Sequence, residues 1–179
     1  GAVKNIIGLI GAGCSVAASI PDFRSKGGLY DTLRPDLITA TTEQREMMAD
    51  DPTQVVNRAM FLQNQFPYLE VRRPFIIGTA ERKWKPTISQ AFYSILHKKN
   101  LLHRLYSQNI DGLDYQVEIP RSKICSVHGT MTKVSCEMCG VDGPDNGSIE
   151  TFAELVKKNI RNIYDATDRE APKESKNIN

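Results

Sequence analysis

The most restrictive feature of this 179-residue chain lies near its N-terminus, where a short apolar run ends in a pair of glycines. Residues 6–10 read Ile-Ile-Gly-Leu-Ile, which is typical of a parallel strand buried on both faces. Gly11-Ala12-Gly13 follows at once, and small residues then lead into a predicted helix. This order predicts a nucleotide-binding turn, because small residues let the backbone approach a phosphate. An ordinary tight turn is the alternative.

The dehydrogenase form of this turn is disfavoured. It requires a third glycine at position 16, where this chain has Val16. Asp31 lies near the distance expected of a ribose-binding acid, but a loop precedes it instead of a second strand. We therefore do not expect a standard hydride-transfer enzyme.

The rest of the chain alternates between predicted strands and helices. Further strands are expected at 101–107 and 122–127, and helices at 41–66 in two pieces, at 88–99 and at 149–164. In the second piece of 41–66 we expect one apolar face, formed by Val55, Ala59, Leu62 and Phe66. In 88–99 the apolar positions are Ile88, Phe92, Ile95 and Leu96. The alternation predicts an α/β fold with a parallel sheet.

Three glycine-rich or polar clusters, at 11–15, 108–111 and 128–129, follow predicted strands. Ligands bind beyond the carboxyl ends of such strands, so we expect these clusters to converge. Asn109 and Asp111 offer an amide and a carboxylate able to hydrogen-bond one carboxamide, although both residue types are also common in turns. His128 is a candidate general base, whereas His97 and His103 are expected to be structural.

The four cysteines do not form an evenly spaced set. Cys136 and Cys139 form a C-x-x-C pair, which favours metal binding in a reducing compartment, with a redox pair as the alternative. A second alternative adds Cys125 and His128 to this pair, which would make a closed zinc site in a small interaction module.

Charge and hydropathy exclude some classes of partner. Lys plus Arg total 23 and Asp plus Glu total 21, a net charge of +2, which argues against nucleic acid or an anionic membrane as the main partner. No apolar run reaches the roughly 20 residues of a membrane span, and no signal peptide opens the chain. We expect an intracellular protein, in the nucleus or the cytoplasm.

Several motifs together resemble the sirtuin family. They are Gly11-Ala12-Gly13-Cys14-Ser15, Ile20-Pro21-Asp22-Phe23-Arg24-Ser25, Gly28-Leu29-Tyr30, Lys85-Pro86-Thr87, Gln108-Asn109-Ile110-Asp111 and His128-Gly129-Thr130, with the Cys136/Cys139 pair following. The resemblance implies an NAD-dependent protein lysine deacylase that transfers the acyl group to ADP-ribose and releases nicotinamide. It implies acylated lysines of proteins as substrate, with histones among the candidates.

The resemblance also implies roles for particular residues. His128 and Asn109 would be catalytic, and Cys136 and Cys139 would hold half of a structural zinc site. The cofactor would be bound by Gly11, Ala12, Gly13, Ser15, Ile20, Asp22, Phe23, Arg24, Tyr30, Gln108, Asn109, Ile110, Asp111 and His128. Residues 1–131 would form a Rossmann-like NAD-binding domain with helices on both faces of its sheet, in which 22–75 are a cofactor loop and helical insert. Residues 132–179 would begin a small zinc module and end in a mobile tail.

Two departures from the family pattern bear on activity. Gln90 stands where a histidine often follows the Pro-Thr pair, and Ser126 replaces an acidic residue often found before the histidine of the third motif. No second C-x-x-C follows residue 140, and the later cofactor segments are missing. We expect part of a larger catalytic core that is inactive alone. A protein ADP-ribosyltransferase and an inactive NAD binder remain alternatives.

Overall fold

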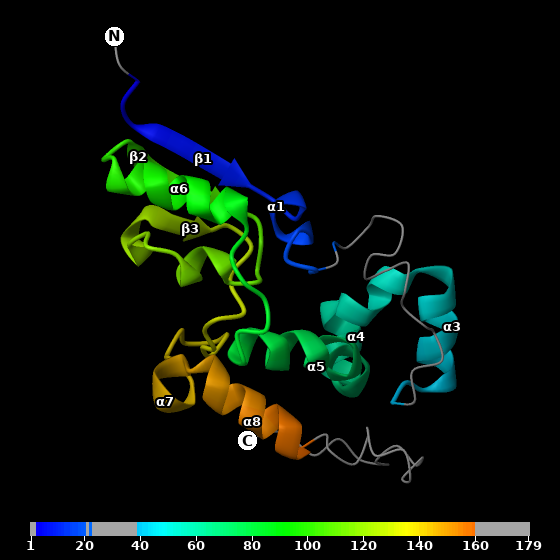
Figure 1. Ribbon diagram of the computed structural model, residues 1–179. Coiled ribbons are helices and arrows are strands. Elements are labelled where there is room, and N and C mark those ends of the chain that lie inside the picture. The colour runs from blue at the N-terminus through cyan, green and yellow to red at the C-terminus, as the bar shows by residue number, and fades with distance from the viewer. Residues whose placement is uncertain (1–2, 21, 23–38, 160–179) are drawn as a thin grey trace.

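The computed structural model describes residues 3–20, 22 and 39–159, and its centre is a three-stranded parallel sheet. The strands β1 (Ile6–Ile10), β2 (Leu102–Ser107) and β3 (Ile124–Ser126) lie side by side in that order (Figure 1). Both strand pairs are parallel, so the carboxyl ends of all three strands share one edge. The predicted strands and their parallel arrangement are confirmed.

One face of the sheet is covered by α6 (Ile88–Lys98). Leu96 of this helix packs against Ile10, Leu105 and Ile124 from the three strands. Gly8 allows the close approach, because a Cβ at this position would lie 2.3 Å from Cε1 of Tyr93. Two short 3-10 helices, Leu113–Gln116 and Arg121–Lys123, connect β2 to β3 beside this core.

The expectation that β1 is buried on both faces is wrong for the described residues. Side chains alternate along the strand, and Ile7 and Leu9 point away from α6 with 60% and 67% exposure. The apolar stripe of α6 also lies differently from the prediction. Ile88, Phe92 and Ile95 are exposed, whereas Gln90 and Ser94 are buried. Gln90 points inward because it caps the N-terminus of α6, where its side chain accepts a hydrogen bond from Thr87 N.

A helical lobe occupies the other side of the molecule (Figure 1). It contains α3 (Thr42–Asp50), the 3-10 helix Pro52–Val56, α4 (Arg58–Gln63) and α5 (Phe66–Ala80). The region 41–66 is thus broken more often than predicted, and the expected apolar face is not continuous, since Leu62 is 66% exposed. The pattern did not predict α5, which begins at Phe66 and contains Pro74.

The last described elements are α7 (Pro144–Gly147) and α8 (Ile149–Asn159), and α8 packs on α5. Ile149, Ala153 and Val156 of α8 join Leu69 and Ile76 of α5 in one apolar cluster. The predicted end of this helix at 164 and the mobile tail 165–179 lie outside the described residues. In the described part of the chain, no helix combines the length and apolar character needed to cross a membrane.

The contact at Gly8 gives a stability prediction. We expect Gly8→Ala to lower the free energy of unfolding by about 1–3 kcal/mol, because the added methyl group displaces the Tyr93 ring in a packed core. Gly13→Ala is the matched control, since a Cβ there meets nothing within 4 Å. Urea unfolding measures both changes, and an equal loss in the two variants would contradict this account.

Candidate functional site

The carboxyl ends of the three strands bring the predicted polar clusters together. The turn from Gly11 leads from β1 into α1 (Gly13–Val16), residues 108–111 follow β2, and His128 follows β3. Backbone hydrogen bonds hold these segments side by side just beyond the strands. Gln108 N donates to Ile10 O at 3.0 Å, and Val127 N donates to Ser107 O at 2.9 Å. The predicted convergence at one sheet edge is confirmed.

Ser15 is hydrogen-bonded to both Asn109 and Asp111 and so joins the first two clusters; we call these three residues the triangle. The Ser15 hydroxyl donates to Asp111 Oδ2 at 2.6 Å, and Asn109 Nδ2 donates to Ser15 Oγ at 3.0 Å and to Gly11 O at 2.9 Å. Ser15 is 2% exposed and Asp111 is 5% exposed. Asp111 also accepts from the backbone N–H of Leu113 at 2.9 Å. The carboxylate is therefore held in one orientation.

The hydrogen bonds determine what this triangle offers a ligand. Both hydrogens of Asn109 Nδ2 are already used, so Asn109 Oδ1 is the atom of that side chain that accepts. Asp111 is an acceptor on both oxygens when ionised. A group with N–H donors, such as a carboxamide, matches this set. The residues present therefore fit the nicotinamide end of NAD.

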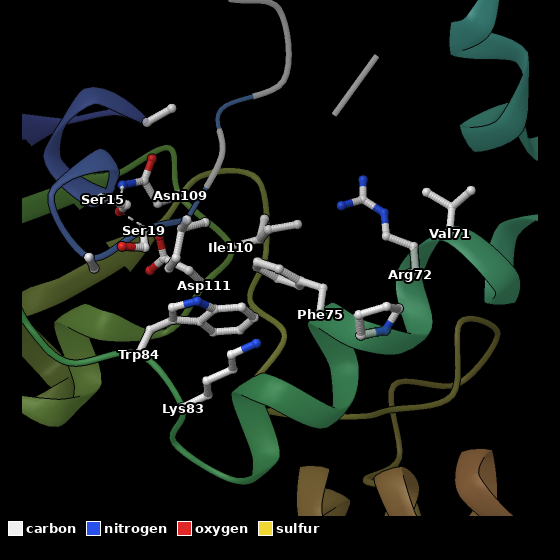
Figure 2. Close-up of a pocket in the computed structure, with 14 residues that line it drawn as sticks. Ser15, Ser19, Val71, Arg72, Phe75, Lys83, Trp84, Asn109, Ile110 and Asp111 are labelled. Carbon is white, nitrogen blue, oxygen red and sulfur yellow. Dashed lines mark hydrogen bonds between the residues drawn. The ribbon is translucent and has the colours of Figure 1, made fainter. Parts of the chain in front are cut away.

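The triangle forms one wall of a cavity of about 630 Å³, a typical size for a small-molecule site (Figure 2). Six of the predicted cofactor residues line it: Ala12, Ser15, Ile20, Asn109, Ile110 and Asp111. Gly11 and Gln108 lie next to this wall, and a Cβ on Gly11 would come within 3.1 Å of Gln108 Oε1. Gly13 is exposed beside them. Asp22 is half-buried and does not line the cavity, while Phe23, Arg24 and Tyr30 lie outside the described residues.

The opposite wall comes from residues that the sequence reasoning missed. Val71, Arg72, Pro74 and Phe75 of α5 line the cavity, with Lys83 and Trp84 of the turn that follows. In Figure 2, Val71 and Arg72 lie on the far side of the cavity from Ser15 and Asn109. The available signal was the pair of aromatic residues, Phe75 and Trp84, in a region without a predicted element. Because α5 has apolar residues nearly all round, no clear period marked it as a helix.

His128 is exposed at the end of β3 and does not line this cavity. Its Nδ1 lies 3.0 Å from the carbonyl oxygen of Gln108. Because a carbonyl oxygen only accepts, a neutral His128 carries its proton on Nδ1, which leaves Nε2 as the basic nitrogen. The backbone carbonyl group of Gln108 thus orients the imidazole ring of His128.

A second buried polar layer lies beneath the triangle and centres on Asp114, which is 3% exposed. Burial raises the pKa of the Asp114 carboxyl, and the charge of Asp111 also raises it. Hydrogen bonds with the side chains of Ser107 and Gln90 lower it. Burial is the largest of these effects, so the pKa of Asp114 lies above its ordinary value. Gln90, which departs from the family pattern, is fully buried here and accepts a hydrogen bond from Thr87 N. The Thr87 hydroxyl donates to Cys14 O at 2.8 Å.

Cys136 and Cys139 are free and exposed, and they lie on a tight turn in which Gly140 N donates to Cys136 O at 2.9 Å. Backbone N–H groups of Cys139 and Met138 point at the Cys136 sulfur and lower its pKa, which favours the thiolate that zinc requires. Within the described residues, no three metal-binding side chains come together. The alternative site that adds Cys125 and His128 is therefore not assembled, and the residues present fit half of a four-ligand zinc site.

Comparison with known proteins agrees with this geometry. A model of the Sir2 family matches residues 11–166. "NAD-dependent protein deacetylase sirtuin-3" of Mus musculus is 34% identical over 139 residues, which are 77% of this chain and 37% of that protein. "NAD-dependent protein deacetylase sir-2.1" of Caenorhabditis elegans is 37% identical over 140 residues, covering 76% of this chain and 20% of that protein.

Solved structures show the same fold. The structure described as "The Structural basis of Sirtuin Substrate Affinity" has a TM-score of 0.62 at 20% identity and covers 84% of this chain and 51% of its own. A Sir2 complex with a deacetylated p53 peptide and 3′-O-acetyl ADP-ribose has a TM-score of 0.54 at 20% identity, covering 85% and 50%. The chain belongs to the Sir2 family, and its Rossmann-like fold is that of these structures. It spans about a fifth to two-fifths of the length of the curated relatives quoted above.

Asp114 and Asp51 give a paired prediction about pH. Because the folded-state pKa of Asp114 is raised, folding loses stability as pH rises above the ordinary value of 3.8, and Asp114→Asn removes this loss. Hydrogen bonds from Thr53 lower the pKa of Asp51, so its contribution is present above 3.8 and disappears as pH falls. We therefore expect the change in unfolding free energy to vary with pH in opposite directions for Asp114→Asn and Asp51→Asn. Denaturant titrations from about pH 2.5 to pH 7, which span both sides of 3.8, check this, and identical slopes would refute it.

The cysteine pair gives a prediction about metal content. We expect the full-length protein to bind one zinc ion and Cys136→Ser to abolish binding, because a structural zinc site needs all four ligands. Cys125→Ala should retain the metal. Elemental analysis of the purified proteins provides the measurement, and loss of zinc from Cys125→Ala would restore the closed-site alternative.

Proposed function

We propose that the full-length protein is an NAD-dependent protein lysine deacetylase or deacylase, which releases nicotinamide and transfers the acyl group to ADP-ribose. The observation that carries the proposal is the triangle of Ser15, Asn109 and Asp111, which places fixed acceptors in a partly open cavity at the sheet edge. The names of the relatives and the peptide in the Sir2 complex support a protein substrate. Histones are candidates for it, and an intracellular location, in nucleus or cytoplasm, belongs to the same proposal.

NAD supplies a ribose carbon that becomes electrophilic when nicotinamide leaves. In this proposal Asn109 and Asp111 hold the carboxamide, and the turn of Gly11, Ala12 and Gly13 accommodates the neighbouring phosphates. Gln108 contacts a ribose and orients His128 through its carbonyl group. The cofactor roles of Ile20, Asp22, Phe23, Arg24 and Tyr30 stay predictions, as do the domain bounds 1–131 and 132–179.

His128 would take a proton from a ribose hydroxyl through Nε2. The hydrogen bond at Nδ1 keeps the neutral ring in the tautomer that this step requires. No metal is needed at the reacting carbon, because the base and the leaving group are both neutral. The zinc site at Cys136 and Cys139 would be structural.

The test uses the full-length protein with NAD and an acetyl-lysine peptide. We expect nicotinamide and O-acetyl-ADP-ribose in equal amounts by mass spectrometry. His128→Ala should lower the rate by about a hundredfold or more, because a general base contributes at least this much. His103→Ala, on an exposed position of β2, is the matched control and should leave the rate unchanged.

Two outcomes would contradict the proposal. ADP-ribose attached to protein without loss of the acetyl group would indicate an ADP-ribosyltransferase. Binding of NAD without nicotinamide release would indicate an inactive binder. We also expect the 179-residue chain alone to be inactive.

A further inference from the structure

His128 lies in a turn that begins at the last residue of β3. Gly129 N donates to Ser126 O at 3.1 Å, which places Val127 and His128 at the two central positions of this turn. The ring of His128 is held from one side, where its Nδ1 lies 3.0 Å from Gln108 O. The orientation of the ring therefore also depends on how Ser126, the first residue of the turn, is held.

The side chain of Ser126 is hydrogen-bonded to Tyr115. Its Oγ lies 2.8 Å from the hydroxyl oxygen of Tyr115, which is 11 residues earlier in the chain. Side chains alternate along a strand, so Ser126 lies on the same face of β3 as the buried Ile124. The Tyr115 ring packs against the core cluster that contains Ile124, which brings the two hydroxyl groups together.

The Tyr115 ring is held by more than this core. The guanidinium carbon of Arg121 lies 4.8 Å from the ring centroid, a distance at which a cation is attracted to an aromatic ring. Tyr115 and Ser126 are both half-buried, so their hydrogen bond is partly protected from water. The position of the Tyr115 hydroxyl is therefore defined by packing as well as by its hydrogen bond.

Tyr115 also belongs to the segment that follows the carboxamide acceptors. It lies in the 3-10 helix Leu113–Gln116, and Asp111 Oδ1 accepts from the N–H of Leu113, the first residue of this helix, at 2.9 Å. A short path of hydrogen bonds and helix backbone thus runs from Asp111 through Tyr115 to Ser126. It joins the carboxylate expected to hold the nicotinamide carboxamide to the turn that carries the expected base.

We propose that Tyr115 and Ser126 are positioning residues for His128, and that their hydrogen bond holds the turn so that Nε2 of His128 faces the ribose of bound NAD. The proposal rests on the proposed deacylase function and adds two residues to its site. Neither residue lines the cavity, so both act through His128. Ser126 stands where the family often has an acidic residue, and the pair of hydroxyl groups holds the turn without a negative charge two residues from the base.

The test measures two rates on the full-length protein with NAD and an acetyl-lysine peptide. Exchange of labelled nicotinamide into NAD reports the cleavage of the bond to nicotinamide, and O-acetyl-ADP-ribose reports the complete reaction. In the proposed function His128 acts on a ribose hydroxyl and not on the bond to nicotinamide. We therefore expect Tyr115→Phe and Ser126→Ala each to lower the kcat of product formation about fivefold, the effect of one neutral hydrogen bond. Nicotinamide exchange and the KM for NAD should stay unchanged.

Three further variants separate positioning from a general loss of stability. Tyr115→Phe combined with Ser126→Ala should be no slower than either single variant, because each change removes the same hydrogen bond. Ser126→Thr keeps the hydroxyl group on a side chain that strands favour, so it should restore product formation. Tyr106→Phe is the matched control, since it removes a phenolic hydroxyl of β2 that has no hydrogen bond within the described residues, and it should leave both rates unchanged.

Several outcomes would overturn the proposal. They are product formation at the wild-type rate in Tyr115→Phe or Ser126→Ala, an equal loss of nicotinamide exchange and product formation, additive losses in the double variant, and a Ser126→Thr variant as slow as Ser126→Ala.

The proposed function can fail separately. If the wild-type protein forms O-acetyl-ADP-ribose and the variants match its rate, the deacylase function stands and this inference falls. If the wild-type protein binds NAD but neither exchanges nicotinamide nor forms O-acetyl-ADP-ribose, the deacylase function itself is wrong, and with it this inference.

Discussion

The hydrogen bond from Ser15 to Asp111 is the contact on which the rest of the site depends. It links the segment after β1 to the segment after β2, and both side chains are almost completely buried. An ionised carboxylate in such a position requires several donors to replace water, and Asp111 has the Ser15 hydroxyl and the Leu113 N–H. Asn109 then completes the arrangement by donating to Ser15 and to Gly11. Two separate stretches of chain, residues 11–15 and 109–113, are thereby held at one sheet edge.

The cavity has two chemically different walls. The sheet edge supplies acceptors with fixed orientation, whereas α5 and the turn after it supply aromatic rings and cations. The two walls come from different parts of the fold, so the sheet can retain a cofactor site while the helix changes what is bound beside it. Gly78 and Trp84 show this division most clearly, because their packing shapes the cavity without touching the sheet.

The sequence predicted the sheet and its polar edge better than the helices. The apolar run at 6–10 and the motif at 108–111 are local patterns, and a parallel sheet places strand ends together, so Asn109 and Asp111 were predicted to face one site. The second wall could not be predicted, since α5 has no polar face to give a period and Arg72 reads as a surface charge. The burial of Ile7, Leu9 and Phe92 was wrongly predicted because it depends on what covers each surface. Gln90 was noted as a departure, but its burial beside Asp114 follows from capping of α6, a tertiary detail.

The central claim is that the triangle of Ser15, Asn109 and Asp111 holds the carboxamide of nicotinamide. A crystal structure of the full-length protein with NAD tests it most directly. The account predicts the carboxamide nitrogen within hydrogen-bond distance of Asp111 or of Asn109 Oδ1, with His128 Nε2 facing the ribose. A nicotinamide ring bound outside this cavity, or a His128 ring that turns Nδ1 toward the ribose, would contradict it.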